Sequence, residues 1–350
     1  MGPNFLKMQE VNKKERLQYI DALRGVAMLM VVFAHVEIYS FFGFQTETTL
    51  TKIISMIHMP LFFFISGFCV YKRERRCRLA KIKGDFLRLI IPALIVGLIY
   101  TDFRVNSFLA DNMKAGYWFT ISLFEMLLIY YILSNVMRND RKLFIISIWV
   151  LAIIFYVVRI PLRWSDIATQ IIDYLSLFQT FSYFLFFCLG ITVAKYKNEV
   201  NSIIINESFR TVILSIIIVL LFIFCNIIPV YSVDTFLWRT LTTLVGTLIG
   251  LFSTLMMYIL FKSVIQFNNQ NILHKSLIVL GNNTLAIYLL HYFVLPSLPM
   301  FGKFLNNNPS VVIELFLGLS VTVMVIVFSF AIKKIIMLSP FLGKVVLGDK

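Results

Sequence analysis

The chain has 350 residues, of which 59% are hydrophobic and only 14% carry a charge. Because a soluble domain has about 25% charged residues, this composition excludes an ordinary soluble protein and indicates an integral membrane protein. The net charge of +14 is better explained by basic loops that orient a membrane protein than by a nucleic-acid partner, so no nucleic acid is expected. The four cysteines show no pairing pattern, and we expect neither a disulfide nor a metal site.

Ten hydrophobic segments follow one another along the chain, each close to the ~20 residues that a helix needs to cross ~30 Å of hydrocarbon. They cover residues 20–42, 54–71, 87–103, 117–137, 143–159, 174–194, 211–229, 237–261, 276–298 and 310–335. The sequence therefore predicts an all-α membrane bundle of about ten transmembrane helices. We expect one membrane domain over 1–350, with short tails at about 1–16 and 337–350.

Lysine and arginine are distributed unequally around these segments. If the N-terminus is cytoplasmic, 24 of the 32 basic residues lie in cytoplasmic segments. The six in outer loops are Lys52, Arg104, Lys114, Arg159, Arg163 and Lys303. Because cytoplasmic loops of membrane proteins are enriched in basic residues, this asymmetry predicts that both termini are cytoplasmic.

The most basic stretch, residues 71–88, joins the second and third hydrophobic segments on the predicted cytoplasmic side. Its spacing is typical of a short amphipathic helix that lies on anionic lipid headgroups. Its arginines include Arg75, Arg76, Arg78 and Arg88. Simple anchoring to the membrane surface explains the first three as well as a binding role does, whereas Arg88 stands just before the third segment.

The first hydrophobic segment carries Asp21, Arg24 and His35. Arg24 and His35 are eleven residues apart, which returns a helix to within ~20° and places them on one face, ~16 Å apart along the axis. Asp21 is one turn before Arg24 and close enough to pair with it. Charged groups in a membrane helix face the bundle interior or a water-filled cavity, so we expect this stripe to face inward. A structural polar seam between helices is the alternative.

Histidine is the natural general base near neutral pH, which makes His35 the candidate base. Glu125, in the fourth segment, could orient or protonate His35, but an interhelical hydrogen bond explains it equally well. His291, in the ninth segment, fits a structural contact slightly better than a functional one.

The second segment begins with the string His58-Met-Pro-Leu-Phe-Phe-Phe-Ile-Ser-Gly-Phe68. Its proline near the start and its run of phenylalanines are unusual in a membrane helix. Ser66 and Gly67 are small enough to let another helix approach closely. A packing contact alone would account for this pair.

Together these strings resemble the membrane acyltransferase family 3, bacterial O-acyltransferases that decorate surface polysaccharides. Ile20-Asp-Ala-Leu-Arg-Gly25 followed by His35 resembles the first-helix signature of the family, and the His58–Phe68 string resembles its second-helix signature. Weaker similarities are Arg88-Leu-Ile-Ile-Pro92, Gly116-Tyr-Trp-Phe119, Phe186-Phe-Cys-Leu-Gly190 and Gly281-Asn-Asn-Thr-Leu-Ala-Ile-Tyr-Leu-Leu-His291. The resemblance spans residues 16 to about 335.

The resemblance implies a multi-pass O-acetyltransferase of the bacterial inner (cytoplasmic) membrane. Such an enzyme takes acetyl from cytoplasmic acetyl-CoA and places it on a hydroxyl of a surface glycan: O-antigen, exopolysaccharide, capsule or a lipid-linked precursor. Direct transfer and an acyl-histidine intermediate both remain open. Some relatives carry an added extracytoplasmic domain, but the chain ends at Lys350 without one, so we expect no two-domain relay.

The resemblance also implies roles for individual residues. His35 would be the base, Arg24 held by Asp21 would bind a polar part of the donor or stabilise charge, and Glu125 would assist. Donor-binding candidates are Arg75, Arg76, Arg78, Arg88, His58, Ser66 and His291. The arginines suit the phosphates of coenzyme A because their forks match phosphate oxygens.

Other functions compete with this interpretation. A transporter or flippase of a glycan or lipid would also have buried charges in a helical bundle, although no inverted repeat is visible. A non-catalytic sensing domain would tolerate loss of His35. Within the family, succinyl could replace acetyl. A homo-oligomer is compatible with the sequence.

Overall fold

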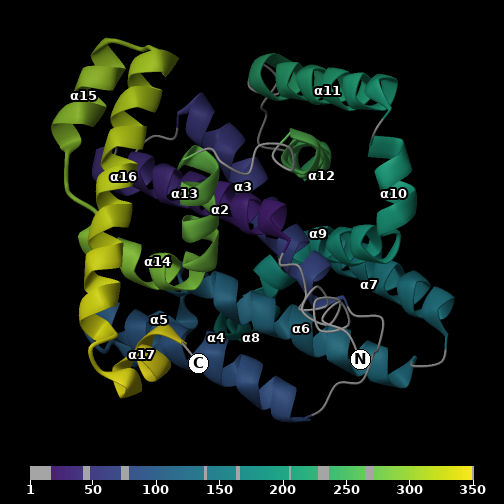
Figure 1. Cartoon of the computed structure of the whole chain (residues 1–350), viewed down its shortest axis with the longest axis horizontal. Coiled ribbons are helices and arrows are strands. Elements are labelled where there is room, and N and C mark those ends of the chain that lie inside the picture. The colour runs from purple at the N-terminus through teal and green to yellow at the C-terminus, as the bar shows by residue number, and fades with distance from the viewer. Residues whose placement is uncertain are drawn as a thin grey trace, which may run out of the picture.

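The computed structural model describes residues 17–41, 48–71, 79–137, 140–162, 166–204, 206–227, 236–264 and 272–348. Within these ranges the chain is almost entirely helical and contains no β-strand (Figure 1). Eight helices there are long and apolar enough to cross a membrane. The protein is therefore an all-α, multi-pass membrane protein, as the composition predicted.

Eight of the ten predicted segments correspond to these helices. They are α2 (Gln18–His35) with the π-helical turn η1 (Val36–Phe41), α3 (Thr49–Val70), α6 (Trp118–Val136), α7 (Arg141–Leu162), α9 (Leu177–Lys195), α11 (Glu207–Phe222), α12 (Phe236–Val264) and α16 (Val311–Ile336). The side of the membrane on which the termini lie stays a prediction.

The third predicted segment differs in where it begins. Helix α4 (Leu79–Tyr100) starts at Leu79 rather than at residue 87 and continues without a break through Pro92. The end of the basic stretch is therefore the first half of this helix and not a separate amphipathic helix. This half carries several charged side chains, among them Lys81 and Asp85, and α4 is not among the eight helices that are apolar enough to span.

The ninth predicted segment is not one straight helix. Helices α13 (Ile272–Asn282) and α14 (Thr284–Leu290), with the 3-10 turn η5 (His291–Val294), are bent relative to each other by 68°. At the bend, the Asn283 side-chain amide donates a hydrogen bond to the Val279 carbonyl (2.7 Å). Asparagine side chains that compete with backbone donors in this way favour helix ends. The hydrogen bond of Asn283 therefore accounts for the break between α13 and α14.

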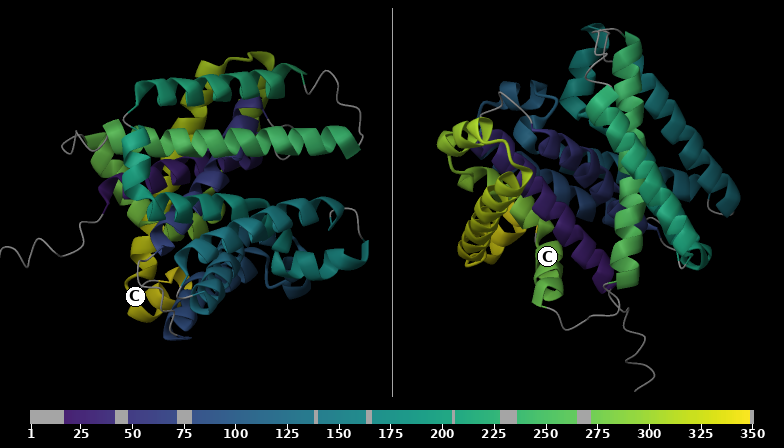
Figure 2. Two further views of the ribbon diagram at one scale, coloured as in Figure 1. Left: turned by 90° about the vertical axis from the view of Figure 1, so that its right-hand side faces the viewer. Right: turned by 90° about the horizontal axis from the view of Figure 1, so that it is seen from above.

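Short helices connect the long ones or close the ends of the bundle (Figure 2). These are α5 (Val105–Ala110), η2 (Lys114–Gly116), α8 (Asp166–Leu175), α10 (Lys197–Ile204), η3 (Ile223–Ile227), α15 (Pro299–Asn307) and α17 (Pro340–Leu347).

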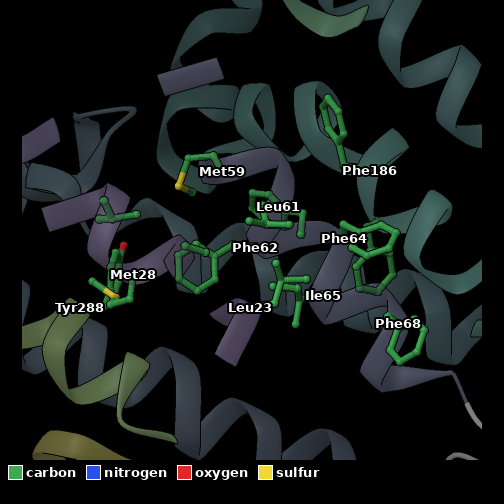
Figure 3. Packing of buried hydrophobic residues seen from close by; sticks show 14 of the residues in the cluster. Leu23, Met28, Met59, Leu61, Phe62, Phe64, Ile65, Phe68, Phe186 and Tyr288 are labelled. Carbon is green, nitrogen blue, oxygen red and sulfur yellow. The ribbon is translucent and has the colours of Figure 1, made fainter. Parts of the chain in front are cut away.

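Helix α2 lies at the centre of the bundle, and 72% of its most apolar stretch is buried. In α11, at the edge of the bundle, only 6% of the corresponding stretch is buried. Helix α3, a neighbour of α2, packs closely on α9 at two glycines. A Cβ atom on Gly67 would overlap the carbonyl oxygen of Phe187, and a Cβ atom on Gly190 would overlap the carbonyl oxygen of Phe64. The close approach predicted at Gly67 is confirmed. Figure 3 shows part of the resulting core, with Leu23 of α2 beside the α3 side chains.

Candidate active site

A cavity of about 540 Å³ lies inside the bundle among α2, α3, α4, α6 and α14. Arg24 and His35 both line it, so the predicted inward stripe of the first helix is confirmed. His35 is the last residue of α2, and the π-helical turn η1 follows it directly. Single π-turns inside helices occur frequently at functional sites.

His35 lies in a cluster of rings at one end of the cavity. Its imidazole stacks on that of His291, with ring centroids 5.0 Å apart and planes 6° apart. The ring of Tyr292 lies 4.9 Å from that of His35. His291 is fully buried, whereas His35 is only partly buried, so His35 faces the cavity and His291 lies behind it.

A chain of hydrogen bonds fixes which nitrogen of His35 carries the proton. His291 Nδ1 lies 3.0 Å from the Ile287 carbonyl oxygen, which only accepts, so Nδ1 must be the donor. In a neutral imidazole the other nitrogen is then the acceptor, so His291 Nε2 accepts from His35 Nδ1 at 2.8 Å. His35 Nε2 is consequently unprotonated, and the Tyr292 hydroxyl, 3.3 Å away, donates to it. The arrangement leaves His35, which itself lines the cavity, with a basic Nε2 that contacts the Tyr292 hydroxyl.

The opposite end of the cavity is charged. Asp21 pairs with Arg24, with Oδ1 and Nη1 3.8 Å apart, as the sequence predicted. Lys81, Asp85 and Arg88 of α4 line the same end. Asp85 accepts a hydrogen bond from the Tyr131 hydroxyl (2.6 Å), so this carboxylate is held on one wall.

Two further predicted residues line the same cavity, and both belong to α3. His58 Nδ1 donates to the Ile54 carbonyl (2.8 Å), so its Nε2 is also an acceptor. The Ser66 hydroxyl donates to the Phe62 carbonyl (2.8 Å), and its oxygen remains able to accept. The structure therefore brings His58 and Ser66 together with Arg24 and His35.

The remaining predicted residues have other locations. The pairing considered between Glu125 and His35 is not found, because Glu125 accepts a hydrogen bond from the Thr180 hydroxyl and does not line the cavity. Glu125 thus makes the interhelical hydrogen bond that was the alternative. Arg75, Arg76 and Arg78 lie outside the described residues.

The segment before α6 closes the cavity at the histidine end. Gly116 lines the cavity with a φ of 97°, and a Cβ atom there would overlap the Tyr292 hydroxyl. The Tyr288 hydroxyl donates to the Gly116 carbonyl (2.7 Å). Lys114 fixes the segment by donating to the carbonyls of Asp111 (2.6 Å) and Asp173, and burial lowers the pKa of its ammonium group. The sequence placed Lys114 in an outer loop, but its side chain is buried.

The family model described as an acyltransferase domain matches residues 17–334, nearly the whole chain. The protein belongs to the acyltransferase 3 family. It is therefore a membrane acyltransferase, as the motifs indicated. No curated protein and no solved structure matches the chain.

Several of the motifs quoted from the sequence of this acyltransferase meet around the cavity. Gly116, Trp118 and Phe119 line it directly. Gly281 lies behind it, where a Cβ atom would overlap the carbonyl oxygen of Asp21. This contact locks α13 against the part of α2 that carries the Asp21–Arg24 pair.

Sequence reasoning missed two groups of residues in this acyltransferase. Lys81 and Asp85 line the charged end together with Arg88, and their spacing of four and three residues, which is one face of a helix, was the available signal. Tyr292 was missed because nothing in the sequence brings it to His35, which is 257 positions away.

Proposed function

We propose that this membrane acyltransferase transfers an acetyl group from cytoplasmic acetyl-CoA to a hydroxyl of a surface glycan, in the bacterial inner membrane. The observation that carries the proposal is one cavity lined by a histidine at one end and by cationic side chains at the other. His35 lines the first end, and Arg24, Lys81 and Arg88 line the second.

The acceptor hydroxyl takes the place of Tyr292 at His35 Nε2. Its proton passes to Nε2 while its oxygen attacks the acyl carbon of the thioester. The carbon–sulfur bond then breaks, and the proton on Nε2 goes to the departing sulfur, so the products are an O-acyl ester and the free thiol of coenzyme A. A base held in this way contributes about 10²–10⁴-fold to such a reaction.

His291 and Tyr292 support this step in different ways. His291 accepts from His35 Nδ1, which keeps Nε2 as the basic nitrogen and stabilises the imidazolium that forms. The Tyr292 hydroxyl, displaced from Nε2, becomes a donor for the developing oxyanion. A buried donor of this kind is effective because water is excluded from its surroundings.

Arg24, Lys81 and Arg88 fit the phosphates of the donor. Guanidinium groups match phosphate oxygens with two parallel N–H donors. Arg24 and His35 are about 16 Å apart along α2, which leaves the cavity between them for the extended pantetheine arm. The thioester then reaches the histidine while the phosphates stay at the membrane surface.

The test of the base is His35→Ala, with expression confirmed, followed by measurement of ester-linked acetyl on the surface glycan. We expect acetylation to fall at least a hundredfold. The control is His274→Leu, because His274 is a buried histidine that does not line this cavity. Undiminished acetylation in His35→Ala would overturn the role of His35.

The test of the donor end is Arg88→Ala, with acetyl-CoA binding measured on the purified protein. We expect weaker binding, and a smaller loss for Arg88→Lys, which keeps the charge but not the fork. Unchanged affinity would mean that Arg88 anchors the protein to the membrane surface and does not bind the donor.

Two further measurements address the reaction itself. Isotopically labelled acetyl-CoA and succinyl-CoA, supplied side by side, identify the acyl group. Movement of a glycan without consumption of acyl-CoA would support a transporter instead.

A further inference from the structure

A second cavity of about 560 Å³ lies next to the first, among α3, α7, α9 and α12. The two cavities share four lining residues, Ser55, Met113, Trp118 and Tyr183. Its size is typical of ligand-binding sites, which occupy about 300–1,000 Å³. A molecule in the second cavity would therefore be separated from the histidine end of the first only by this shared wall.

The second cavity lies at the opposite end of the bundle from the proposed donor phosphates. It is lined by Lys52 and Pro60 from the first half of α3, whereas Ser66 from the second half of α3 lines only the first cavity. Lys52 and Ser66 are about 21 Å apart along the helix axis. The distribution of basic residues predicts that the Lys52 end faces the outside.

The walls of the second cavity suit a ring that carries hydroxyl groups. Trp118 and Tyr183 are stacked at 5.5 Å with planes 20° apart and present flat apolar surfaces. Gln179 is buried, with 5% of its surface exposed, and its Oε1 has no hydrogen-bond partner within the described residues. A buried carbonyl oxygen without a donor is costly, and a sugar hydroxyl would supply that donor. The Ser182 oxygen is a second acceptor on the same wall.

Two basic side chains, Lys52 and Arg159, line the same cavity, and among the described residues that line it there is no aspartate or glutamate. Arg159 is buried, and its guanidinium lies over the Tyr156 ring at 4.0 Å, which fixes its direction. Fixed arginine forks favour carboxylates and phosphates over neutral ligands.

We propose that the second cavity is the acceptor site and that it takes a sugar with an anionic group. This proposal rests on the acyl transfer proposed above, because it names the substrate of that reaction. The aromatic pair holds the sugar ring, Gln179 accepts from one of its hydroxyls, and Lys52 and Arg159 bind the anion. The anion is either a carboxylate on the ring or a phosphate that links the sugar to a lipid. The reacting hydroxyl reaches His35 past Ser55 and Met113.

The test places a thiol in the second cavity with Ser182→Cys and follows its modification site by site with mass spectrometry. The reagents are sulfonatoethyl methanethiosulfonate, an anion, and trimethylammonium-ethyl methanethiosulfonate, a cation. We expect Lys52→Gln and Arg159→Gln each to lower the anion-to-cation rate ratio by roughly three- to tenfold. Cys69, which lines only the first cavity, is the internal control and should keep its ratio. Because Lys52 is exposed, its variant keeps the test valid if Arg159→Gln does not fold.

A second measurement identifies the ligand class by protection of the same thiol. The probes are methyl glucuronide, methyl glucoside and farnesyl phosphate, each added to purified protein without acyl donor. We expect the glucuronide or the prenyl phosphate to slow modification and the neutral glucoside to have a much smaller effect. Protection by the glucuronide indicates a ring carboxylate, and protection by the prenyl phosphate indicates a lipid-linked sugar.

A rate ratio that both charge variants leave unchanged would overturn the anionic site, as would equal protection by the neutral glucoside. Failure of both anionic probes to protect the thiol would overturn the acceptor assignment. None of these measurements requires turnover, so they should be unaffected by His35→Ala. A failed acceptor site is thereby distinguished from a failed catalytic base.

Discussion

Replacing His291 tests the hydrogen-bond chain that orients His35. In His291→Leu the Nδ1–H of His35 loses the acceptor that the structure shows for it, Nε2 of His291 at 2.8 Å. In His291→Gln the side-chain amide oxygen can take the position of that nitrogen and accept the same proton. This hydrogen-bond chain therefore predicts that the wild type is more active than His291→Gln, and that His291→Gln is clearly more active than His291→Leu.

The size of the effect follows from the hydrogen bond that is lost. A buried N–H group without a partner costs about 1–3 kcal/mol, and each 1.36 kcal/mol corresponds to a factor of ten. The tautomer with a basic Nε2 is disfavoured by this amount in His291→Leu, so kcat should fall by about 5- to 150-fold. KM for acetyl-CoA should change little, because His291 lies behind His35 and does not line the cavity.

The assay uses native membrane vesicles, labelled acetyl-CoA and the endogenous glycan, with kcat and KM determined separately for each variant. His274→Leu again controls for the loss of a buried histidine. The reasoning is refuted if His291→Leu retains wild-type kcat, if His291→Gln is as impaired as His291→Leu, or if only KM changes. In the last two cases His291 would be a packing residue.

Two further predictions concern the fold and its direction in the membrane. Gly67→Ala should destabilise the protein by about 1–3 kcal/mol, because its Cβ would overlap the Phe187 carbonyl oxygen. The control is Gly84→Ala, whose Cβ would meet nothing within 4 Å and which should leave the stability unchanged. Thermal unfolding in detergent measures both variants, and equal stability of the two would contradict the packing. In intact cells, a membrane-impermeant thiol reagent should modify Ser182→Cys before permeabilisation and Cys69 only afterwards, and the reverse order would contradict cytoplasmic termini.

The sequence predicted the fold class well because hydrophobic length is a strong signal for membrane helices. It also predicted that Arg24 and His35 share a cavity, because helical periodicity fixes which residues share a face. It did not predict the bend at Asn283, since the average hydrophobicity of residues 276–298 continues across it. A side chain that replaces one backbone hydrogen bond leaves almost no trace in a hydropathy pattern.

The partners of His35 could not be predicted from the sequence. The sequence offered Glu125 as a possible partner. Which residue contacts His35 depends on which helices are neighbours, and neither periodicity nor charge determines this. The structure brings His291 to His35 because α14 turns away from α13 at Asn283 and carries η5 to the end of α2. The residue that looked structural is the one that contacts the base.

Two cavities with a shared wall offer a simple answer to how a group can pass between the two sides of a membrane. A transporter must expose one site alternately to each side, which requires two arrangements of its helices. With the donor in the first cavity and the acceptor in the second, as proposed, each substrate enters from its own side, and the reacting hydroxyl meets the acyl group at His35, past the shared wall. In that arrangement the acyl transfer itself requires no alternating movement. Bulk added at Ser55, on the shared wall, would therefore slow transfer without weakening acetyl-CoA binding at Arg24 and Arg88.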